Sequence, residues 1–161
     1  TKLGPVLWQL PPTAQFDATD IEGFLQLLPA RAGAARLRHA LEVRHASFVD
    51  AAFISLARRY NVATVLADSH RYPTVADVTA DFTYVRLMNS VASQDTGYEK
   101  KALAIWAKRA QSWAAGDAPT DLPMINGSHC TAADGRDVFM YAINGAKERA
   151  PAAAMYLLSR L

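Results

Sequence analysis

The order of hydrophobic and polar residues predicts a chain that alternates between strands and helices. Five segments combine short apolar runs or a two-residue period with flanking turn residues, which is typical of strands. They are "GPVLWQLPP" (4–12), "RLRHALEVRH" (36–45), "NVATVLADSH" (61–70), "DFTYVRLMN" (81–89) and "DVFMYAIN" (137–144). A helical period predicts helices over about 19–28, 50–61 and 98–115, and from near Pro151 onward.

Residues that favour helix ends support these limits. Thr19, with Glu22 three residues later, resembles a capping box at the start of the first helix. Asn61 and Gly116 suit the ends of the second and third helices. Residues 117–136 show no periodicity and contain several turn residues, so we expect a long surface loop there.

Strands that alternate with helices indicate a parallel sheet with helical crossovers. Polar residues inside the strands help to choose between two such folds. Glu42 and Arg44 alternate with Leu41 and Val43, and Arg86 likewise lies opposite its apolar neighbours. An open sheet covered by helices on both faces leaves little room for such charges, whereas the interior of a barrel is polar at its mouth. We therefore expect an α/β fold of the parallel (β/α)8 TIM-barrel type, with a doubly wound open sheet as the weaker alternative.

Composition narrows the class of protein. The chain has 161 residues, of which 51% are hydrophobic and 20% are charged, and its formal net charge is +2. These values are typical of one globular domain, 1–161, and they give no bulk attraction to nucleic acid. No apolar run approaches the roughly 18 residues of a membrane span. Cys130 is the only cysteine, so no internal disulfide can form, and we expect a cytoplasmic protein that does not bind membranes.

The strand segments resemble, in order and approximate spacing, the second half of the YecE-like family, TIM-barrel proteins whose biochemical function is not established. "QLPP" and "E-x-RH-x-S", here at 9–12 and 42–47, are the more specific motifs. The resemblance implies that the segments correspond to barrel strands four to eight. Family members carry about three further strand–helix units upstream, with a "GTSGW" strand and an "E-x-N-x-TFY" strand, and this chain has neither.

The resemblance therefore predicts a partial barrel of about five β/α units. Because unpaired sheet edges are unfavourable, we expect that the sequence is truncated or that another segment supplies the missing N-terminal barrel strands. The chain also departs from the family where "YVRLHG" is replaced by "YVRLMN", and where "YFDND" is replaced by "YAING". Only Asn144 matches the polar residues of the second pattern.

Ligands of TIM barrels bind at the C-terminal ends of the strands, so polar residues at these ends are the candidates. Glu42 and Asp68 are candidates for a general acid or base. Arg44 and Arg86 could hold an anionic group by bidentate hydrogen bonds, with Gln9 and Asn144 as further ligand-binding residues. Tyr98, which resembles a family tyrosine after strand seven, could close over the ligand. The alternative is that Glu42 pairs with Arg44 or Arg86 in a buried network that serves stability alone.

His45 is a candidate proton shuttle, although a lone histidine after a strand is more often a hydrogen-bonded loop residue. Ser69 is interpreted as a cap of the connection after its strand rather than a ligand contact. A metal site could combine Glu42, His45 and Asp68, but no metal-binding motif supports it, and we expect no metal and no cofactor. His129 and Cys130 are adjacent in a loop, which does not establish a catalytic pair.

Two functions from different classes remain. The first is an enzyme that acts on a small anionic or phosphorylated substrate at the barrel mouth. The second is a binding module without turnover, which uses the same arginines to hold phosphate groups or a nucleic-acid backbone. The second rests on fold analogy alone. The sequence names neither the substrate nor the reaction.

Overall fold

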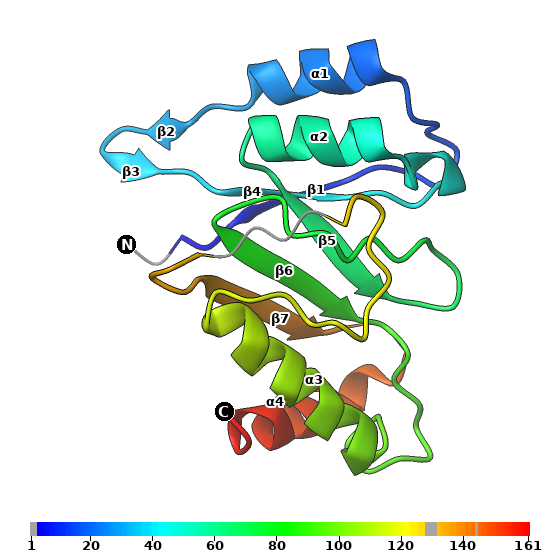
Figure 1. The fold of residues 1–161 in the computed structure, drawn as a ribbon. Coiled ribbons are helices and arrows are strands. Elements are labelled where there is room, and N and C mark those ends of the chain that lie inside the picture. Colours follow the sequence, from blue (N-terminus) through cyan, green and yellow to red (C-terminus); the bar gives the residue numbers. More distant parts are fainter. Residues whose placement is uncertain (1–2, 128–131, 144) are drawn as a thin grey trace.

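The structure, a computed structural model, describes residues 3–127, 132–143 and 145–161. Its centre is a sheet of five parallel strands in the order β1-β4-β5-β6-β7 (Figure 1). The strands are β1 (Val6–Gln9), β4 (His39–Glu42), β5 (Ala63–Asp68), β6 (Phe82–Leu87) and β7 (Asp137–Ala142). Each strand therefore pairs with the strands that precede and follow it in this sheet. The prediction of an α/β fold with a parallel sheet is confirmed.

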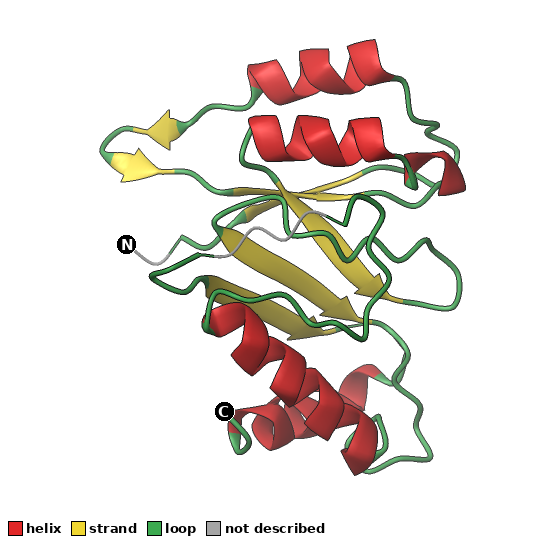
Figure 2. Ribbon diagram, viewed as in Figure 1, coloured by secondary structure: helices red, strands yellow, loops and turns green. Residues whose placement is uncertain are grey.

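Helices follow most of the strands, as Figure 2 shows. They are α1 (Ala18–Leu27), α2 (Ala51–Arg59), α3 (Lys100–Ala114) and α4 (Ala150–Leu158), with short 3-10 helices η1 (Ala46–Phe48) and η2 (Lys147–Arg149). Helices α1 and α2 pack together beside β1 and β4, and α3 and α4 pack together beside β6 and β7 (Figure 1). The part of the chain that the structure describes contains no helix long and apolar enough to cross a membrane.

The two faces of the sheet carry different residues. Successive side chains of a strand point to opposite faces. One face packs against helices through two hydrophobic clusters, which contain Leu41 with residues of α1 and α2, and Val85 with residues of α3 and α4. The opposite face carries a third cluster without helix residues: Leu7, Ala40, Ala63, Val65, Ala80, Phe82, Tyr84 and Phe139. We call the first the helix face and the second the inner face.

The connection from β5 to β6 is irregular, since residues 69–81 contain neither helix nor strand. Its second half is buried nonetheless, because residues 75–80 pack against the sheet and its helices. Thr79 replaces part of the missing backbone pairing. Its hydroxyl donates to the Val62 carbonyl over 2.7 Å and accepts from the Thr64 amide over 2.8 Å.

The start of α1, the hairpin after it and the end of α2 are three local details to compare with the sequence-based expectations. The cap of α1 is Asp17, whose carboxylate accepts from the Thr19 and Asp20 amides, so the predicted capping box at Thr19 is wrong. Asp17 is favoured as the cap over Thr19 because it directly precedes the first turn, where its carboxylate also interacts with the positive end of the helix dipole. A hairpin of β2 (Arg31–Ala32) and β3 (Ala35–Arg36) was not predicted. Asn61 has a φ of 50° after α2, as its predicted role at a helix end requires.

Candidate functional site

Glu42 is the centre of a polar cluster on the inner face. It ends β4, its side chain is fully buried, and its two carboxylate oxygens accept from different arginines. The Arg44 Nε donates to Oε1 over 2.7 Å, and an Arg86 guanidinium nitrogen donates to Oε2. A buried carboxylate needs such partners, because an unpaired charge would carry a large desolvation penalty. Both arginines remain partly accessible, with 17% and 16% of their side chains exposed.

Gln9 joins the two arginines from the neighbouring strand. It ends β1 directly beside Glu42 in the parallel register. Its side-chain oxygen accepts from Arg44 over 2.7 Å and from Arg86 over 3.2 Å. Because both partners are cationic donors, the amide oxygen must face them, and the NH2 group points elsewhere. Two guanidinium groups are thus held side by side by one carboxylate and one amide.

A cleft of about 680 Å³ opens next to these arginines. Arg44 and Arg86 line it together with Arg71, Tyr72 and Lys147. The Arg44 guanidinium lies 4.3 Å from the centroid of the Tyr72 ring, an arrangement that gains a cation–π attraction and fixes the plane of the guanidinium. Among the described residues that line the cleft, four carry a positive charge and none carries a negative charge.

The four cations come from four separate parts of the chain. Arg44 follows β4, Arg71 follows β5, Arg86 lies in β6 and Lys147 lies in η2 after β7. All of them therefore lie at or near the C-terminal ends of parallel strands, where α/β proteins bind ligands. The geometry can hold an anion through donors from several sides.

Tyr84 and Tyr141 continue the inner face around Arg86, since Tyr84 precedes Arg86 by two residues in β6 and Tyr141 is in register with Arg86 on β7. Their rings lie 5.1 Å apart between centroids, with 31° between the planes. Burial, more than the neighbouring Tyr141, raises the pKa of the Tyr84 hydroxyl above its usual range, while Arg86 has a smaller opposite effect. Tyr84 is thus a neutral, largely buried neighbour of the cluster.

Asp68 does not join this cluster, although it also ends a strand. It has the strand parity of Leu66, which belongs to the helix-face core, and so it points to the helix face. Its carboxylate accepts from the Tyr98 hydroxyl over 2.8 Å and from the Asn89 side-chain amide over 3.0 Å. The Tyr98 hydroxyl in turn accepts from the Asn89 backbone amide over 2.6 Å. We call this triad the Asp68 cluster.

Tyr98 is held in its neutral form by this environment. Burial, together with the hydrogen bond to the Asp68 carboxylate, raises the pKa of Tyr98 far above its usual value. The hydroxyl thus acts as a donor to Asp68. The structure places Tyr98 within the fold, where it secures the segment after β6 against the end of β5.

His45 has a local contact that explains its position. It precedes η1, and its Nδ1 accepts from the Ser47 backbone amide over 3.2 Å and lies 2.8 Å from the Ser47 hydroxyl. This is the arrangement of a helix N-cap. Ser69 likewise accepts from the Arg71 backbone amide over 3.1 Å. Asn144 lies outside the described residues.

The described residues contain no group of three or more His, Cys, Asp or Glu side chains that could hold a metal ion. The three residues that a metal site would have combined lie in different surroundings, with Glu42 on the inner face, His45 at η1 and Asp68 beside Tyr98.

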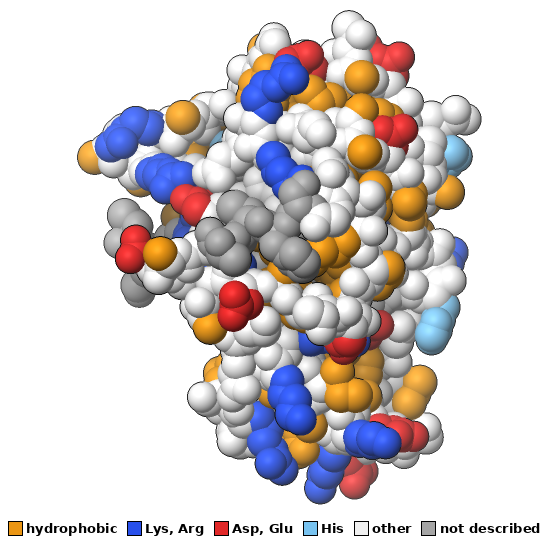
Figure 3. Space-filling view, in the orientation of Figure 1, with side chains coloured by type: hydrophobic (Ala, Val, Ile, Leu, Met, Phe, Trp, Pro, Cys, Tyr) orange, Lys and Arg blue, Asp and Glu red, His pale blue; other side chains and the backbone are white. Residues whose placement is uncertain are grey.

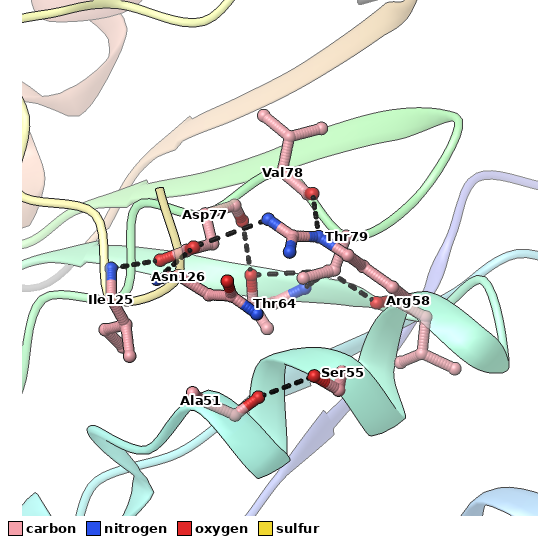
Figure 4. Close-up of polar contacts among 10 residues, drawn as sticks. Ala51, Ser55, Arg58, Thr64, Asp77, Val78, Thr79, Ile125 and Asn126 are labelled. Atoms are coloured by element: carbon pink, nitrogen blue, oxygen red, sulfur yellow. Dashed lines mark hydrogen bonds and ion pairs between the residues drawn. The ribbon is translucent and has the colours of Figure 1, made fainter. Parts of the chain in front are cut away.

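Sequence reasoning missed a second fully buried carboxylate, Asp77, in the irregular β5–β6 connection (Figure 4). It accepts from the backbone amides of Ile125 over 2.7 Å and Asn126 over 2.9 Å, and it pairs with Arg58 of α2 at 3.4 Å. Asp77 therefore fastens the segment after α3 to the β5–β6 connection. No periodic signal marks such a residue, because its partners lie 48 and 49 residues away.

The surface charge is mixed where the molecule is shown in space-filling form. In Figure 3, Lys and Arg side chains are scattered over the visible face and interspersed with acidic side chains. This face therefore lacks the continuous basic stripe that is typical of nucleic-acid backbone binding.

Comparison with known proteins identifies relatives of the chain. Residues 1–161 match the family described as "Protein of unknown function DUF72". A DUF72 family protein from Enterococcus faecalis V583 has a similar structure, with a TM-score of 0.63 and 14% identity over 98% of this chain and 61% of its own. For a DUF72 family protein from Thermotoga maritima MSB8, the corresponding values are 0.62, 15%, 96% and 55%.

The chain spans about 55 to 61% of the length of those two proteins. At such low identity, the similarity concerns the fold alone. No curated protein sequence matches the chain. The chain therefore belongs to the DUF72 family, which is the YecE family that its sequence motifs resemble.

Proposed function

We propose that this protein binds a small anionic ligand in the cleft at the C-terminal ends of its parallel strands. The observation that carries the proposal is the convergence of Arg44, Arg71, Arg86 and Lys147 on one cleft. Like charges repel, so a fold that gathers four cations around one space is stabilised when an anion enters it. Phosphate and carboxylate groups are the anions that guanidinium groups hold best.

Arg44 and Arg86 are prepared for this role before the ligand arrives. Glu42 and Gln9 fix both guanidinium groups, so little side-chain entropy is lost on binding. Within the described part of the chain, Nη1 of Arg44 and both Nε and Nη2 of Arg86 donate no hydrogen bond. These N–H groups are the donors that the ligand would use.

Glu42 acts in this proposal as the residue that orients the arginines. Both of its oxygens already accept hydrogen bonds from guanidinium groups, so the carboxylate holds the two arginines in place. An enzyme that uses Glu42, Asp68 or His45 for proton transfer stays a prediction. Its test is a reaction assay once a ligand is known.

The site fits the mouth of a (β/α)8 barrel, and we propose that the five strands form part of such a barrel. Sequential strand order, helices packed on one face and charged residues at the strand ends on the other support this proposal. Further strands, from the same polypeptide or another, would then pair with β1 and β7. In a closed barrel they would also enclose the inner face beside Tyr141, which is 41% exposed here.

The first experiment is a thermal-shift screen of the protein with anionic metabolites. A ligand that binds only the folded state raises the Tm by mass action. We expect the Tm shift to be smaller in Arg71→Gln and Lys147→Gln. These variants suit the test because the side chains of Arg71 and Lys147 line the cleft and make no hydrogen bond within the described structure, so their loss should disturb the fold little. Lys108→Gln is the matched control, because Lys108 lines a different cleft beside α3.

The outcome also separates small ligands from nucleic acid. A shift that persists unchanged in both cleft variants would overturn the proposal, as would a full panel without any shift. Binding of single-stranded or double-stranded DNA, with affinity that falls steeply with salt and depends on Arg44 and Arg86, would instead support a backbone-binding module. The concave shape of the site favours the small ligand.

A further inference from the structure

We propose that the ligand of this cleft carries a dianionic phosphate group, as a phosphomonoester does, rather than a monoanionic phosphodiester or a single carboxylate. This inference rests on the proposed function and specifies its ligand class. It starts from the balance of charge at the cleft. Within the described residues, only one carboxylate forms ion pairs with any of the four lining cations, that of Glu42, which contacts two of them.

Three positive charges therefore remain without a negative partner at the cleft. Arg44 and Arg86 share Glu42, so the pair of them keeps one excess charge. Arg71 makes no ion pair and reaches only the ring of Tyr72, at 5.9 Å, and Lys147 makes no ion pair, among the residues described. A monoanion would leave two of the three charges unbalanced, whereas a dianion leaves one.

The other clefts show that such an imbalance is not general in this molecule. A cleft of about 670 Å³ between α3 and the following segment is also lined by charged residues. There, however, Asp121 accepts from Arg109 through both carboxylate oxygens: Oδ2 accepts from Nη2 over 2.9 Å and from Nε over 3.1 Å, and Oδ1 accepts from Nε over 3.4 Å. Other exposed arginines are paired in a similar way, as Arg36 is with Asp81 and Arg59 is with Glu22.

The geometry further favours a compact group over two separate charges. The side-chain oxygen of Gln9 accepts from both guanidinium groups, and each group also donates to one oxygen of Glu42, so the two groups lie close together. A phosphomonoester offers three terminal oxygens to such donors, and a phosphodiester offers two. A diester would also have to extend chain out of the cleft on two sides.

Calorimetric titration of the whole chain with methyl phosphate and methyl sulfate tests the charge requirement. The two probes have nearly the same size and tetrahedral shape, but at pH 8 methyl phosphate is a dianion and methyl sulfate a monoanion, because the second pKa of a phosphomonoester is about 6. At equal ionic strength, we expect methyl phosphate to bind about tenfold more tightly. Dimethyl phosphate should bind as weakly as methyl sulfate.

Variants link the preference to the excess charge. Lys147→Gln and Arg71→Gln should each reduce the preference for methyl phosphate severalfold, whereas Lys108→Gln should leave it unchanged. Equal affinity for the two probes, with both affinities reduced in the cleft variants, would overturn the dianion inference and leave the proposed function intact. Absence of binding by all three probes at millimolar concentration would overturn both. Succinate that binds as tightly as methyl phosphate would overturn the assignment to a phosphate ester.

Discussion

Glu42 and Arg86 form an ion pair across an intervening strand. Glu42 ends β4 and Arg86 lies in β6, 44 residues later in the chain, while β5 runs between them. Strands two places apart in a sheet are separated by about 9 to 10 Å, so the two side chains must cross the inner face of β5. The residue of β5 in register with Arg86 is Ala67, a buried alanine on this face. Its small side chain leaves the space that the ion pair occupies.

The first prediction concerns the charge of Glu42. Glu42→Gln removes the negative charge between two guanidinium groups while it keeps the shape of the side chain. Loss of one partner from a buried pair costs roughly 3 to 5 kcal/mol, and the partial exposure of the arginines lowers this to about 2 kcal/mol of unfolding free energy here. Urea denaturation followed by circular dichroism measures this difference.

Glu22→Gln is the matched control for this measurement. Glu22 accepts from an arginine, Arg59, and from the Tyr60 hydroxyl, but its ion pair with Arg59 is exposed, and loss of that ion pair should cost less than about 1 kcal/mol. If the two variants lost equal stability, the network around Glu42 would contribute no more than a surface pair.

The second prediction concerns the space above β5. Ala67→Leu fills this space with three additional carbons and should separate Glu42 from Arg86. We expect a loss of about 1 to 3 kcal/mol of unfolding free energy, from overpacking and from the weakened ion pair. The same variant should bind anionic ligands less tightly, because Arg86 loses its orientation.

A double-mutant cycle shows whether the two effects share one cause. If Ala67→Leu already disrupts the ion pair, Glu42→Gln should cost less in that background than in the wild type. The coupling energy should then be about 1 kcal/mol or more. Additive effects would place Ala67 outside the network.

The inner-face cluster shows what sequence periodicity can predict. Glu42 and Arg44 alternate with Leu41 and Val43, and this alternation alone placed the charges on the face opposite the helices, where the structure has them. The end of α2 was predictable from a local signal, because asparagine tolerates the positive φ that Asn61 adopts, whereas the start of α1 was not, because Asp17 caps it in place of Thr19. The pairing of Glu42 with Arg44 or Arg86 could be stated only as an alternative to a ligand site, because a contact between β4 and β6 depends on the order of strands in the sheet, and the structure shows that Glu42 pairs with both arginines.

Asp68 and Asp77 show where sequence reasoning reached its limit. The strand that ends at Asp68 carries apolar residues on both of its faces, so its pattern did not indicate toward which face of the sheet the carboxylate would point. Asp77 lies in a segment without any period, and its partners come from α2 and from the segment after α3. Long-range contacts of single polar side chains are decided by the packing of whole elements, which local propensity does not encode.

The third prediction is a pH dependence that originates from Tyr98. Its pKa is raised in the folded state above the ordinary value of 10.0, so the folded state retains the hydroxyl proton when the unfolded state loses it. Stability from this group is therefore complete below about pH 10 and decreases as the pH rises above that value. The slope for one such proton is about 1.4 kcal/mol per pH unit.

Tyr98→Phe is the variant that isolates this effect. It removes the hydrogen bonds to Asp68 and Asn89 and should cost about 1 to 3 kcal/mol near neutral pH. The difference in unfolding free energy between wild type and variant should shrink from about pH 9 to about pH 11. Tyr156→Phe provides the control, since Tyr156 lies on α4 and is not part of the Asp68 cluster. A constant difference for Tyr98→Phe over this range would contradict the prediction.

The fourth prediction concerns the attachment of the segment after α3. Asp77→Asn keeps the size of the side chain but replaces one acceptor oxygen with an NH2 group, which cannot accept from the Ile125 or Asn126 amide. We expect a loss of about 2 kcal/mol of unfolding free energy relative to the wild type. Hydrogen exchange should become faster than in the wild type at these two amides, and the increase should be larger there than at the amides of β6. Asp121→Asn is the control, because Asp121 is exposed and pairs only with Arg109 within the described structure. Unchanged exchange at Ile125 and Asn126 would show that this segment is held by its other contacts, whereas selective exchange there would establish Asp77 as its anchor.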